Sequence, residues 1–422
     1  MGHAAVIVDG ELHLARSRVA SRGGRRAWGD RDEDAVTLAA RAALALLARN
    51  QDARPGVLVL ATTTPPYRLG GSVQPLAEIL ALAGDVVAVE LTATPRDGLA
   101  ALRVGAALAG DGVPALVVAA HRGAGAGAED GDGAVALLLG AGPAAVEVDL
   151  GAARVEEARE RWALAGSAAE REGDPSLTAA LVAERARALA DGEGPGLVSL
   201  AGRRPTERLE RSLGGPGDPV AGRAGFLGAA HAPARLLADA ERAQTIVATA
   251  NGLTEIVRAR PGPGAGAVAA RAAQALAAGE EVERAPEAPA RDEGFSPYQS
   301  LPRAGRERAQ ELRLAAARCR GCGRVVYPPP VASCPSCGAA GPHEPARLGR
   351  EGEVLTLTRD HVYPDGQTTT MAVVSMDGGG RFYGQVVPSG AVGVGERARL
   401  VPRVLHRGED VVQYFWKVEP CR

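Results

Sequence analysis

The chain has 422 residues, of which 46% are hydrophobic, and a formal net charge of −2. This length implies two or three domains, and the composition excludes disorder over the whole chain. A nearly neutral charge argues against a generic binder of nucleic acids or membrane surfaces. No apolar run reaches the roughly 18 residues of a membrane span, and the start lacks the pattern of a signal peptide, so we expect a cytoplasmic protein.

Short runs of Val, Leu and Ile alternate with Ala- and Leu-rich helical stretches across residues 1–260. The predicted strands are residues 57–61, 86–91, 115–120, 134–140, 196–201 and 244–250. The predicted helices are one capped by Asp32, then residues 72–84, 97–110, a stretch headed by Ser176, and the segment AAHAPARLLADAERA. This alternation is typical of crossover units in a layered α/β fold. We expect one such domain made of two halves, about 1–150 and 151–260.

The remainder of the chain differs in character. Residues 261–302 are rich in Pro, Gly and acidic side chains and predict a linker with one helix. A charged helix over 303–317 leads into a group of cysteines, within a predicted segment of 303–346. Residues 347–422 contain five short strand-like runs separated by turn residues, which predicts a small all-β barrel of the OB-fold type. In its last strand, alternation places Tyr414 and Trp416 on one face and Phe415 on the other, one face in the barrel core and the other towards a partner.

Four of the five cysteines form two C-x-x-C pairs, Cys319 with Cys322 and Cys334 with Cys337. Such pairs form knuckles whose thiolates complete a tetrahedral site, and thiolates favour zinc over magnesium or calcium. Four sulfurs leave no open position for water, so we predict a structural zinc ion. Iron bound as in rubredoxin and a redox dithiol are the alternatives. Each pair is followed by a glycine, where a positive φ is expected.

The order of these segments resembles known proteins. A charged helix, the motif RCRGCGRVVYPPPVASCPSCG and a following GQVV strand resemble the zinc-ribbon/OB-fold proteins that accompany thiolases. The segments DEDAVTLAARAALALLA, VLVLATTTPPY, VELTATPRDGLAALRVGAALA, EDGDGAVALLLG and AGFLGAAHAPARLL resemble the thiolase superfamily, closest to hydroxymethylglutaryl-CoA synthase and ketoacyl synthase III. The resemblance implies a thiolase-like domain, fused to a rubredoxin-like zinc ribbon and an OB-fold.

The chemistry of that family needs a cysteine nucleophile at a helix N-terminus, and a His and an Asn that stabilise negative charge. Here Pro95 or a neighbour occupies the place of the cysteine, and no cysteine precedes Cys319. Ala201 lies near the expected His, and Phe226 stands at the Asn position. We therefore assign no catalytic residues, and the sequence identifies no cofactor-binding residues.

Other polar residues are candidates to replace the missing nucleophile and its helpers. Thr92 and Thr94 lie near the nucleophile turn, but a hydroxyl needs an adjacent base, and the candidates are His121 and His231. We interpret both histidines as hydrogen-bonded or surface residues. The acidic residues of the Gly-rich segment before the 134–140 strand, Glu129, Asp130 and Asp132, predict a solvated turn.

The resemblance and the missing residues together suggest a pseudoenzyme. We expect an accessory subunit that binds acyl-CoA, forms a homodimer through its thiolase-like core, and serves a separate thiolase or ketoacyl synthase. One alternative is an active acyltransferase or condensing enzyme with a nucleophile other than cysteine, such as Thr94 with His231. The least favoured alternative is nucleic-acid binding by the OB-fold. We expect no membrane partner.

Overall fold

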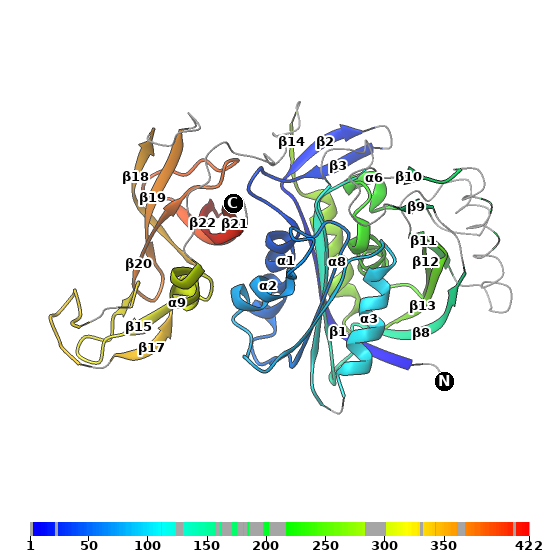
Figure 1. Cartoon of the computed structure of the whole chain (residues 1–422), viewed down its shortest axis with the longest axis horizontal. Coiled ribbons are helices and arrows are strands. Elements are labelled where there is room, and N and C mark those ends of the chain that lie inside the picture. The colour runs from blue at the N-terminus through cyan, green and yellow to red at the C-terminus, as the bar shows by residue number, and fades with distance from the viewer. Residues whose placement is uncertain are drawn as a thin grey trace. The chain divides into compact units, whose positions relative to one another are not determined.

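The computed structural model describes residues 3–21, 24–110, 112–123, 130–156, 160–162, 171–174, 180, 184, 197–201, 217–282, 301–329, 332–341, 343–361, 368–407 and 411–421. The helix expected after Ser176 lies almost entirely outside them. The chain forms two compact units. Unit 1 comprises Met1–Gly29, Arg41–Val73 and Leu82–Ala285; unit 2 comprises Asp30–Ala40, Gln74–Ala81 and Pro286–Arg422. Figure 1 shows the ribbon and its labels.

A nine-stranded sheet forms the centre of unit 1, in the order β11-β12-β13-β8-β1-β7-β6-β4-β5. Its strands are β1 (His3–Leu14), β4 (Val57–Thr62), β5 (Val87–Leu91), β6 (Ala115–His121), β7 (Gly133–Leu139), β8 (Val146–Val155), β11 (Leu197–Ala201), β12 (Gln244–Ala250) and β13 (Leu253–Pro261). Strands β4, β6 and β7 are buried along their whole length, as continuous apolar runs require. All six predicted strands are confirmed, whereas β1, β8 and β13 were not predicted.

The sheet repeats one pairing pattern in its two halves. From β1 outward, β1 pairs antiparallel with β7, β7 antiparallel with β6, and β6 lies parallel to β4. From β8 outward, β8 pairs antiparallel with β13, β13 antiparallel with β12, and β12 lies parallel to β11. Strands β1 and β8 pair antiparallel and join the halves. The halves that the sequence predicts therefore share a topology.

Helices α3 (Asp97–Leu108) and α7 (His231–Ala238) lie between the two halves of the sheet. Helix α3 contacts β4, β6 and β13, and α7 contacts β7, β11 and β12; the two helices also contact each other. This arrangement brings the N-terminal end of α3 next to the short helix η1 (Gly228–Ala230), because Gly98 lies directly against the carbonyl oxygen of Ala229. A Cβ at Gly98 would lie 1.8 Å from that oxygen.

Further elements complete unit 1. Helix α8 (Ala265–Ala277) packs against β1 with Val268 and Ala269 buried, within the range predicted as a linker. The remaining elements are β2 (Ser17–Ser21), β3 (Gly24–Trp28), β9 (Arg161–Trp162), β10 (Arg171–Glu172), β14 (Glu280–Glu281) and α6 (Ala221–Ala224).

Helix α1 (Ala35–Arg49) begins three residues after the predicted cap, Asp32. The Asp34 carboxylate accepts a hydrogen bond from the backbone N–H of Thr37 at 2.9 Å, so Asp34 and not Asp32 caps the helix. The prediction of Asp32 was wrong because three acidic residues follow one another there, and the sequence does not show which one the backbone turn places at the cap. Helix α2 covers Val73–Ile79.

Unit 2 ends in a five-stranded antiparallel sheet in the order β20-β19-β18-β21-β22. Its strands are β18 (Glu351–Asp360), β19 (Thr369–Met376), β20 (Arg381–Gln385), β21 (Arg397–Arg407) and β22 (Val412–Pro420). All five were predicted. A single bridge between Val386 and Val418 links the two edges, and no strand pair closes a barrel within the part that the structure describes. Tyr414 and Trp416 are both buried, so theirs is the face that enters the core, and neither ring is available to a nucleic acid.

The segment before this sheet departs from the prediction in one respect. Helix α9 (Leu301–Glu311) ends early, and Leu314 adopts a φ of 55°. Residues Ala315–Arg318 form β15, which pairs with β16 (Val325–Val326) and β17 (Glu344–Arg347). The predicted helix over 303–317 was therefore too long. Its last alanines favour a helix locally, but pairing with β17 overrides that preference.

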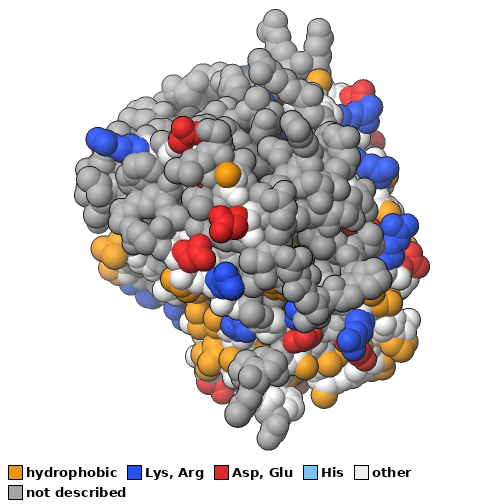
Figure 2. All heavy atoms as spheres, turned by 90° about the vertical axis from the view of Figure 1, so that its right-hand side faces the viewer, with side chains coloured by type: hydrophobic (Ala, Val, Ile, Leu, Met, Phe, Trp, Pro, Cys, Tyr) orange, Lys and Arg blue, Asp and Glu red, His pale blue; other side chains and the backbone are white. Residues whose placement is uncertain are grey.

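The described helices include none that is long and apolar enough to span a membrane. On the face drawn in Figure 2, the described Arg and Lys side chains are interspersed with Asp, Glu and hydrophobic side chains. Among the described residues, that face presents no large area of a single charge.

Candidate functional site

The four cysteines of the two C-x-x-C pairs lie together in unit 2. Their sulfurs all lie within 4.8 Å of one another. The Sγ atoms of Cys319 and Cys337 are 3.7 Å apart, and those of Cys322 and Cys334 are 3.9 Å apart. A tetrahedron with Zn–S bonds of about 2.3 Å has edges of about 3.8 Å, whereas a disulfide is about 2.05 Å long. The cluster therefore fits a metal ion bound by four thiolates.

Each knuckle has the same local geometry. The N–H of Gly323 donates to the carbonyl of Cys319, and the N–H of Gly338 donates to that of Cys334, both at 2.8 Å. Gly323 and Gly338 have φ values of 70° and 72°, which confirms the predicted turns. Backbone N–H groups also point at sulfur, from Gly321 to Cys319 at 3.3 Å and from Ser336 to Cys334 at 3.4 Å. Because these contacts are local in sequence, the spacing alone predicts them.

In unit 1, the turn at the start of α3 is closed by its own carboxylate. Asp97 Oδ2 accepts hydrogen bonds from the backbone N–H groups of Ala93 at 2.8 Å and Thr94 at 2.9 Å. The Thr94 hydroxyl donates to Asp97 Oδ1 at 3.1 Å, and both residues are buried. Sequence reasoning overlooked Asp97, although a carboxylate three residues after a threonine is a recognisable local signal.

A buried ion-pair network holds the same turn. The carboxylate of Glu255 on β13 forms ion pairs with Arg96 at 2.7 Å and with Arg103 at 2.9 Å. The Glu255 side chain is only 4% exposed. Arg103 also donates to the carbonyl oxygen of Gly151 at 2.8 Å. The turn that would carry a nucleophile in the resemblance is thus fixed to β13 by charged groups.

His231 begins α7, and both of its ring nitrogens are engaged. Nδ1 accepts the N–H of Leu227 at 3.3 Å, and Nε2 lies 2.7 Å from Asp218. Arg235, fully buried, pairs with Asp218 at 3.2 Å. Burial alone would raise the pKa of Asp218, but His231 and Arg235 outweigh burial and hold that pKa below its usual value. Among the described contacts, Thr94 and His231 form no hydrogen bond with each other. The Thr94 hydroxyl bonds to Asp97, and the His231 ring bonds to Leu227 and Asp218.

His121 ends β6, and its ring is buried. Nδ1 lies 2.8 Å from the hydroxyl of Thr63, which follows β4. Burial, with smaller contributions from Arg122 and His231, lowers the pKa of His121 to about 4, so the ring is neutral at physiological pH. The prediction of a hydrogen-bonded histidine is confirmed, although Thr63, 58 residues away, was not recognised as its partner.

The position predicted for an Asn is indeed occupied by a buried Phe226, whose ring lies 4.6 Å from that of His231. Ala201 ends β11. Neither Phe226 nor Ala201 has a polar side chain, so neither can stabilise a developing charge.

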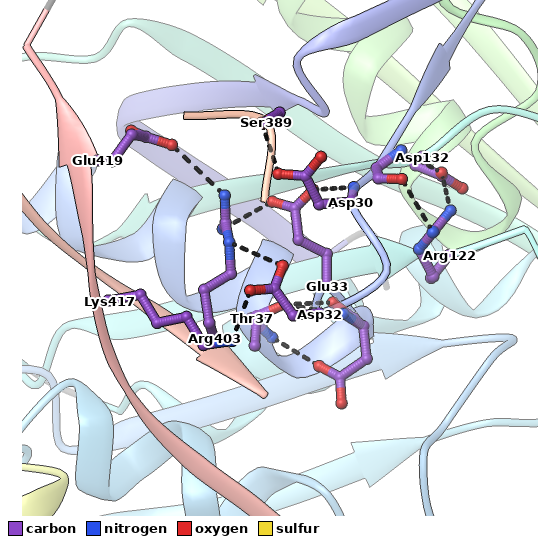
Figure 3. A network of polar contacts seen from close by, with 12 residues as sticks. Asp30, Asp32, Glu33, Thr37, Arg122, Asp132, Ser389, Arg403, Lys417 and Glu419 are labelled. Atoms are coloured by element: carbon purple, nitrogen blue, oxygen red, sulfur yellow. Dashed lines mark hydrogen bonds and ion pairs between the residues drawn. The ribbon is translucent and has the colours of Figure 1, made fainter. Parts of the chain in front are cut away.

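The interpretation of Asp132 as part of a solvated turn was wrong. Its side chain is 1% exposed and accepts hydrogen bonds from the N–H groups of Gly29 and Gly123, both at 2.7 Å. It also pairs with Arg122 (Figure 3). Turn chemistry predicted the bend correctly, but an arginine ten residues away makes burial of the charge favourable. Glu129 lies outside the described residues.

A second buried network lies in unit 2, around the acidic residues that precede α1 (Figure 3). Arg403 on β21 lies 3.4 Å from Asp32 and 3.4 Å from Glu419, and Lys417 on β22 lies 2.9 Å from Asp32. Tyr414 donates to Asp34 at 2.8 Å. Burial raises the pKa of Asp34, and burial together with the nearby Glu33 raises that of Asp30. The network anchors the first turn of α1 to the C-terminal sheet.

The fold of unit 1 is that of the thiolase-like condensing enzymes. The hydroxymethylglutaryl (HMG) synthase of the curacin biosynthetic pathway, solved with an acetyl donor acyl carrier protein (ACP), has a TM-score of 0.55 at 16% identity, covering 66% of this chain and 86% of that one. MvaS, solved with 3-hydroxy-3-methylglutaryl coenzyme A, has a TM-score of 0.52 at 19% identity, and the match covers 67% of this chain and 90% of MvaS. PksG, an HMG-CoA synthase from Bacillus subtilis, has a TM-score of 0.53 at 15% identity, and the match covers 66% of this chain and 85% of PksG.

A family model matches a different part of the chain, around the cysteine cluster. Residues 306–343 match the ChsH2 rubredoxin-like zinc ribbon domain. No curated protein matches the chain. The chain therefore combines a thiolase-like α/β core, a zinc ribbon with four clustered cysteines, and a C-terminal all-β sheet.

Proposed function

We propose that this protein is a non-catalytic accessory subunit that binds acyl-CoA for a thiolase or condensing enzyme. One observation carries the proposal: no cysteine precedes Cys319, and the turn at the start of α3 is closed instead by the carboxylate of Asp97. In addition, ion pairs of Glu255 on β13 with Arg96 and Arg103 fix this turn and α3 to the sheet. An acyl-CoA or an acyl group on a carrier protein is the ligand class that the solved structures of the fold suggest.

Two measurements with the purified chain test this proposal. Free thiol release is followed with acetyl-CoA and acetoacetyl-CoA, and calorimetry measures the binding of CoA and acetyl-CoA. We expect binding without turnover. Turnover by the chain alone would contradict the accessory role, and no binding of either ligand would contradict the acyl-CoA assignment.

The alternative, an active acyltransferase, has one supporting observation. Thr94 donates its hydroxyl hydrogen to a carboxylate, Asp97, at 3.1 Å, which is the arrangement of a hydroxyl nucleophile with a base. Both Asp97 oxygens also accept other hydrogen bonds, so we favour a structural role in closing the turn. Mass spectrometry of a peptide spanning 90–98 after incubation with acetyl-CoA separates the two: an acyl adduct supports the enzyme, and Thr94→Val must abolish it.

We assign a structural zinc ion to Cys319, Cys322, Cys334 and Cys337, supported by the sulfur geometry and the match to a zinc ribbon. When bound, the ion would cross-link two knuckles whose surroundings contain little apolar core. Four thiolate ligands leave no position for a substrate, so the ion would take no part in acyl transfer.

A homodimer through the thiolase-like core is part of the proposal. Strand β5 is at one edge of the nine-stranded sheet, and Val87 on it is 50% exposed. An edge with free backbone groups is suited to pair with a second copy. Light scattering should give the mass of a dimer, and Val87→Lys should shift it to a monomer, whereas Val113→Lys, at a 44% exposed position outside the strands, should not. An unchanged dimer in Val87→Lys would exclude this edge.

The finer domain assignments are also proposals. They comprise a thiolase-like domain at 1–260, a linker at 261–302, a helix and zinc ribbon at 303–346, and an OB-fold at 347–422. The order of the five strands and the bridge between Val386 and Val418 support a partly open OB barrel. A separate thiolase or ketoacyl synthase partner and a cytoplasmic location complete the proposal.

A further inference from the structure

Four arginines of unit 2 lie around the point where the ribbon strand β17 leads into β18, the first strand of the C-terminal sheet. Two backbone hydrogen bonds bring them together. The N–H of Leu348 donates to the carbonyl oxygen of Leu314 at 2.9 Å, and the N–H of Leu400 donates to that of Arg350 at 2.6 Å. Each of the other three arginines directly precedes one of these leucines in the chain. The four are Arg313, Arg347, Arg350 and Arg399.

Two of the four arginines have a carboxylate partner. Arg313 lies 2.5 Å from Glu78, in the part of α2 that belongs to unit 2. Arg399 lies 2.8 Å from Glu419 on β22. The positive charges of these two arginines are therefore compensated within the protein.

Arg347 and Arg350 have no such partner among the residues that the structure describes. Arg347 donates one N–H to the carbonyl oxygen of Ile79 at 3.3 Å. Within the described parts of the chain, the guanidinium of Arg350 forms neither a hydrogen bond nor an ion pair. The adjacent carboxylate, Glu351, is 64% exposed and lies 3.8 Å from Arg397. Two positive charges thus stay uncompensated at this junction.

The charges of these arginines act on one another. Desolvation is the main cause that lowers the pKa of Arg347, and the charges of Arg350 and Arg313 lower it further. Desolvation also lowers the pKa of Arg350; Glu351 opposes this effect, and Arg399 adds to it. The arginines are therefore close enough to repel one another, and a bound anion would relieve that repulsion.

Both unpaired arginines can be reached from solvent, because Arg347 is exposed and Arg350 is half-buried. A guanidinium is a planar fork of N–H donors that matches the oxygens of a carboxylate or a phosphate. A carboxylate carries one negative charge, whereas a phosphate carries up to two. The two uncompensated charges therefore match a phosphate better than a carboxylate.

We propose that Arg347 and Arg350 together bind a phosphate group. Free phosphate and a phosphate monoester, such as the 3′-phosphate of CoA, share this chemistry. Either would accept hydrogen bonds from both guanidinium groups, beside the two arginines that are already paired. This site does not depend on the acyl-CoA binding proposed above.

Calorimetry of the full chain with inorganic phosphate tests the site. We expect Arg347→Gln and Arg350→Gln each to weaken phosphate binding about tenfold, because each removes charge-assisted hydrogen bonds to the anion. Arg350→Lys should weaken it as well, since an ammonium keeps the charge but lacks the planar fork. The matched control is Arg359→Gln on β18, which removes an exposed arginine and should leave the affinity unchanged.

Thermal unfolding gives a second readout. Phosphate should raise the unfolding midpoint of the wild type and of Arg359→Gln, but much less that of Arg347→Gln, because a ligand stabilises the folded state that binds it. Arg347 is exposed, so this variant keeps the test valid even if Arg350→Gln does not fold.

CoA and 3′-dephospho-CoA distinguish the two sources of phosphate. Tighter binding of CoA, with a difference that Arg347→Gln abolishes, would support the site and identify the 3′-phosphate as its ligand. Equal binding of the two, with free phosphate still dependent on both arginines, would support a site for free phosphate. No phosphate binding by the wild type, an equal affinity for acetate, or unchanged affinity in both Gln variants would overturn the inference.

Discussion

The guanidinium Nη1 of Arg403 lies 2.7 Å from the carboxylate of Glu33, and both side chains are only 3% exposed. They are 370 residues apart in the sequence, yet both belong to unit 2. Burial would lower the pKa of Arg403, but Glu33, Asp32 and Glu419 outweigh it and keep the guanidinium charged.

Removal of Arg403 should therefore destabilise the fold strongly. Arg403→Met leaves several buried carboxylates without their shared cation, and we expect a loss of about 3 to 5 kcal/mol in the free energy of unfolding. The control is Arg399→Met on the same strand, where Arg399 is 45% exposed and pairs with Glu419. It should cost less than about 1 kcal/mol. Urea denaturation measures both, and equal losses would contradict a special role for the buried network.

The neutral state of His121 predicts a pH dependence of stability. Its pKa is lowered from 6.5 to about 4, so between these values the unfolded state binds a proton that the folded state does not. The stabilisation is complete above pH 6.5 and is lost as the pH falls towards 4, by about 3 kcal/mol. His121→Gln should flatten this part of the stability curve, whereas His361→Gln, which replaces an exposed histidine, should not. Parallel curves for the wild type and His121→Gln would show that His121 titrates normally.

Metal analysis should find one zinc ion per chain. Cys334→Ser should lose the metal and lower the thermal unfolding midpoint of unit 2, because the ion replaces the missing core of the ribbon. Cys421 lies outside the cluster, so Cys421→Ser should retain the metal. Iron in place of zinc, or full metal content in Cys334→Ser, would contradict the assignment.

Gly228 provides a test of close packing. Gly228→Ala combines a positive φ with a Cβ 2.3 Å from His121, and we expect a loss of at least about 2 kcal/mol. Gly217 also has a positive φ, of +89°, but a Cβ there would meet nothing within 4 Å. Gly217→Ala should cost about 1 kcal/mol. Thermal unfolding of both variants checks the difference, and similar losses would mean that Gly228 is needed for its backbone angle alone.

Local patterns allowed much of the molecule to be predicted. The two C-x-x-C knuckles, the turns at Gly323 and Gly338, and the five C-terminal strands depend on neighbours within a few residues, so the sequence contains their signal directly. The absence of a cysteine before Cys319 is likewise a property of the sequence. The length of the helix before the ribbon was misjudged because the pairing of β15 with β17, a contact with residues about 30 positions away, decides it.

The tertiary structure decided which polar residues are buried and with which partners. Asp132 lies in a turn, but Arg122 and two backbone N–H groups make it a buried residue. The partner of His121 is Thr63, 58 residues away in the sequence. Of the acidic residues before α1, Asp34 caps the helix, whereas Asp32 and Glu33 are buried in ion pairs with Arg403 and Lys417. Whether a charge lies in water or in a protein interior depends on distant groups, and a linear pattern specifies only the nearby ones.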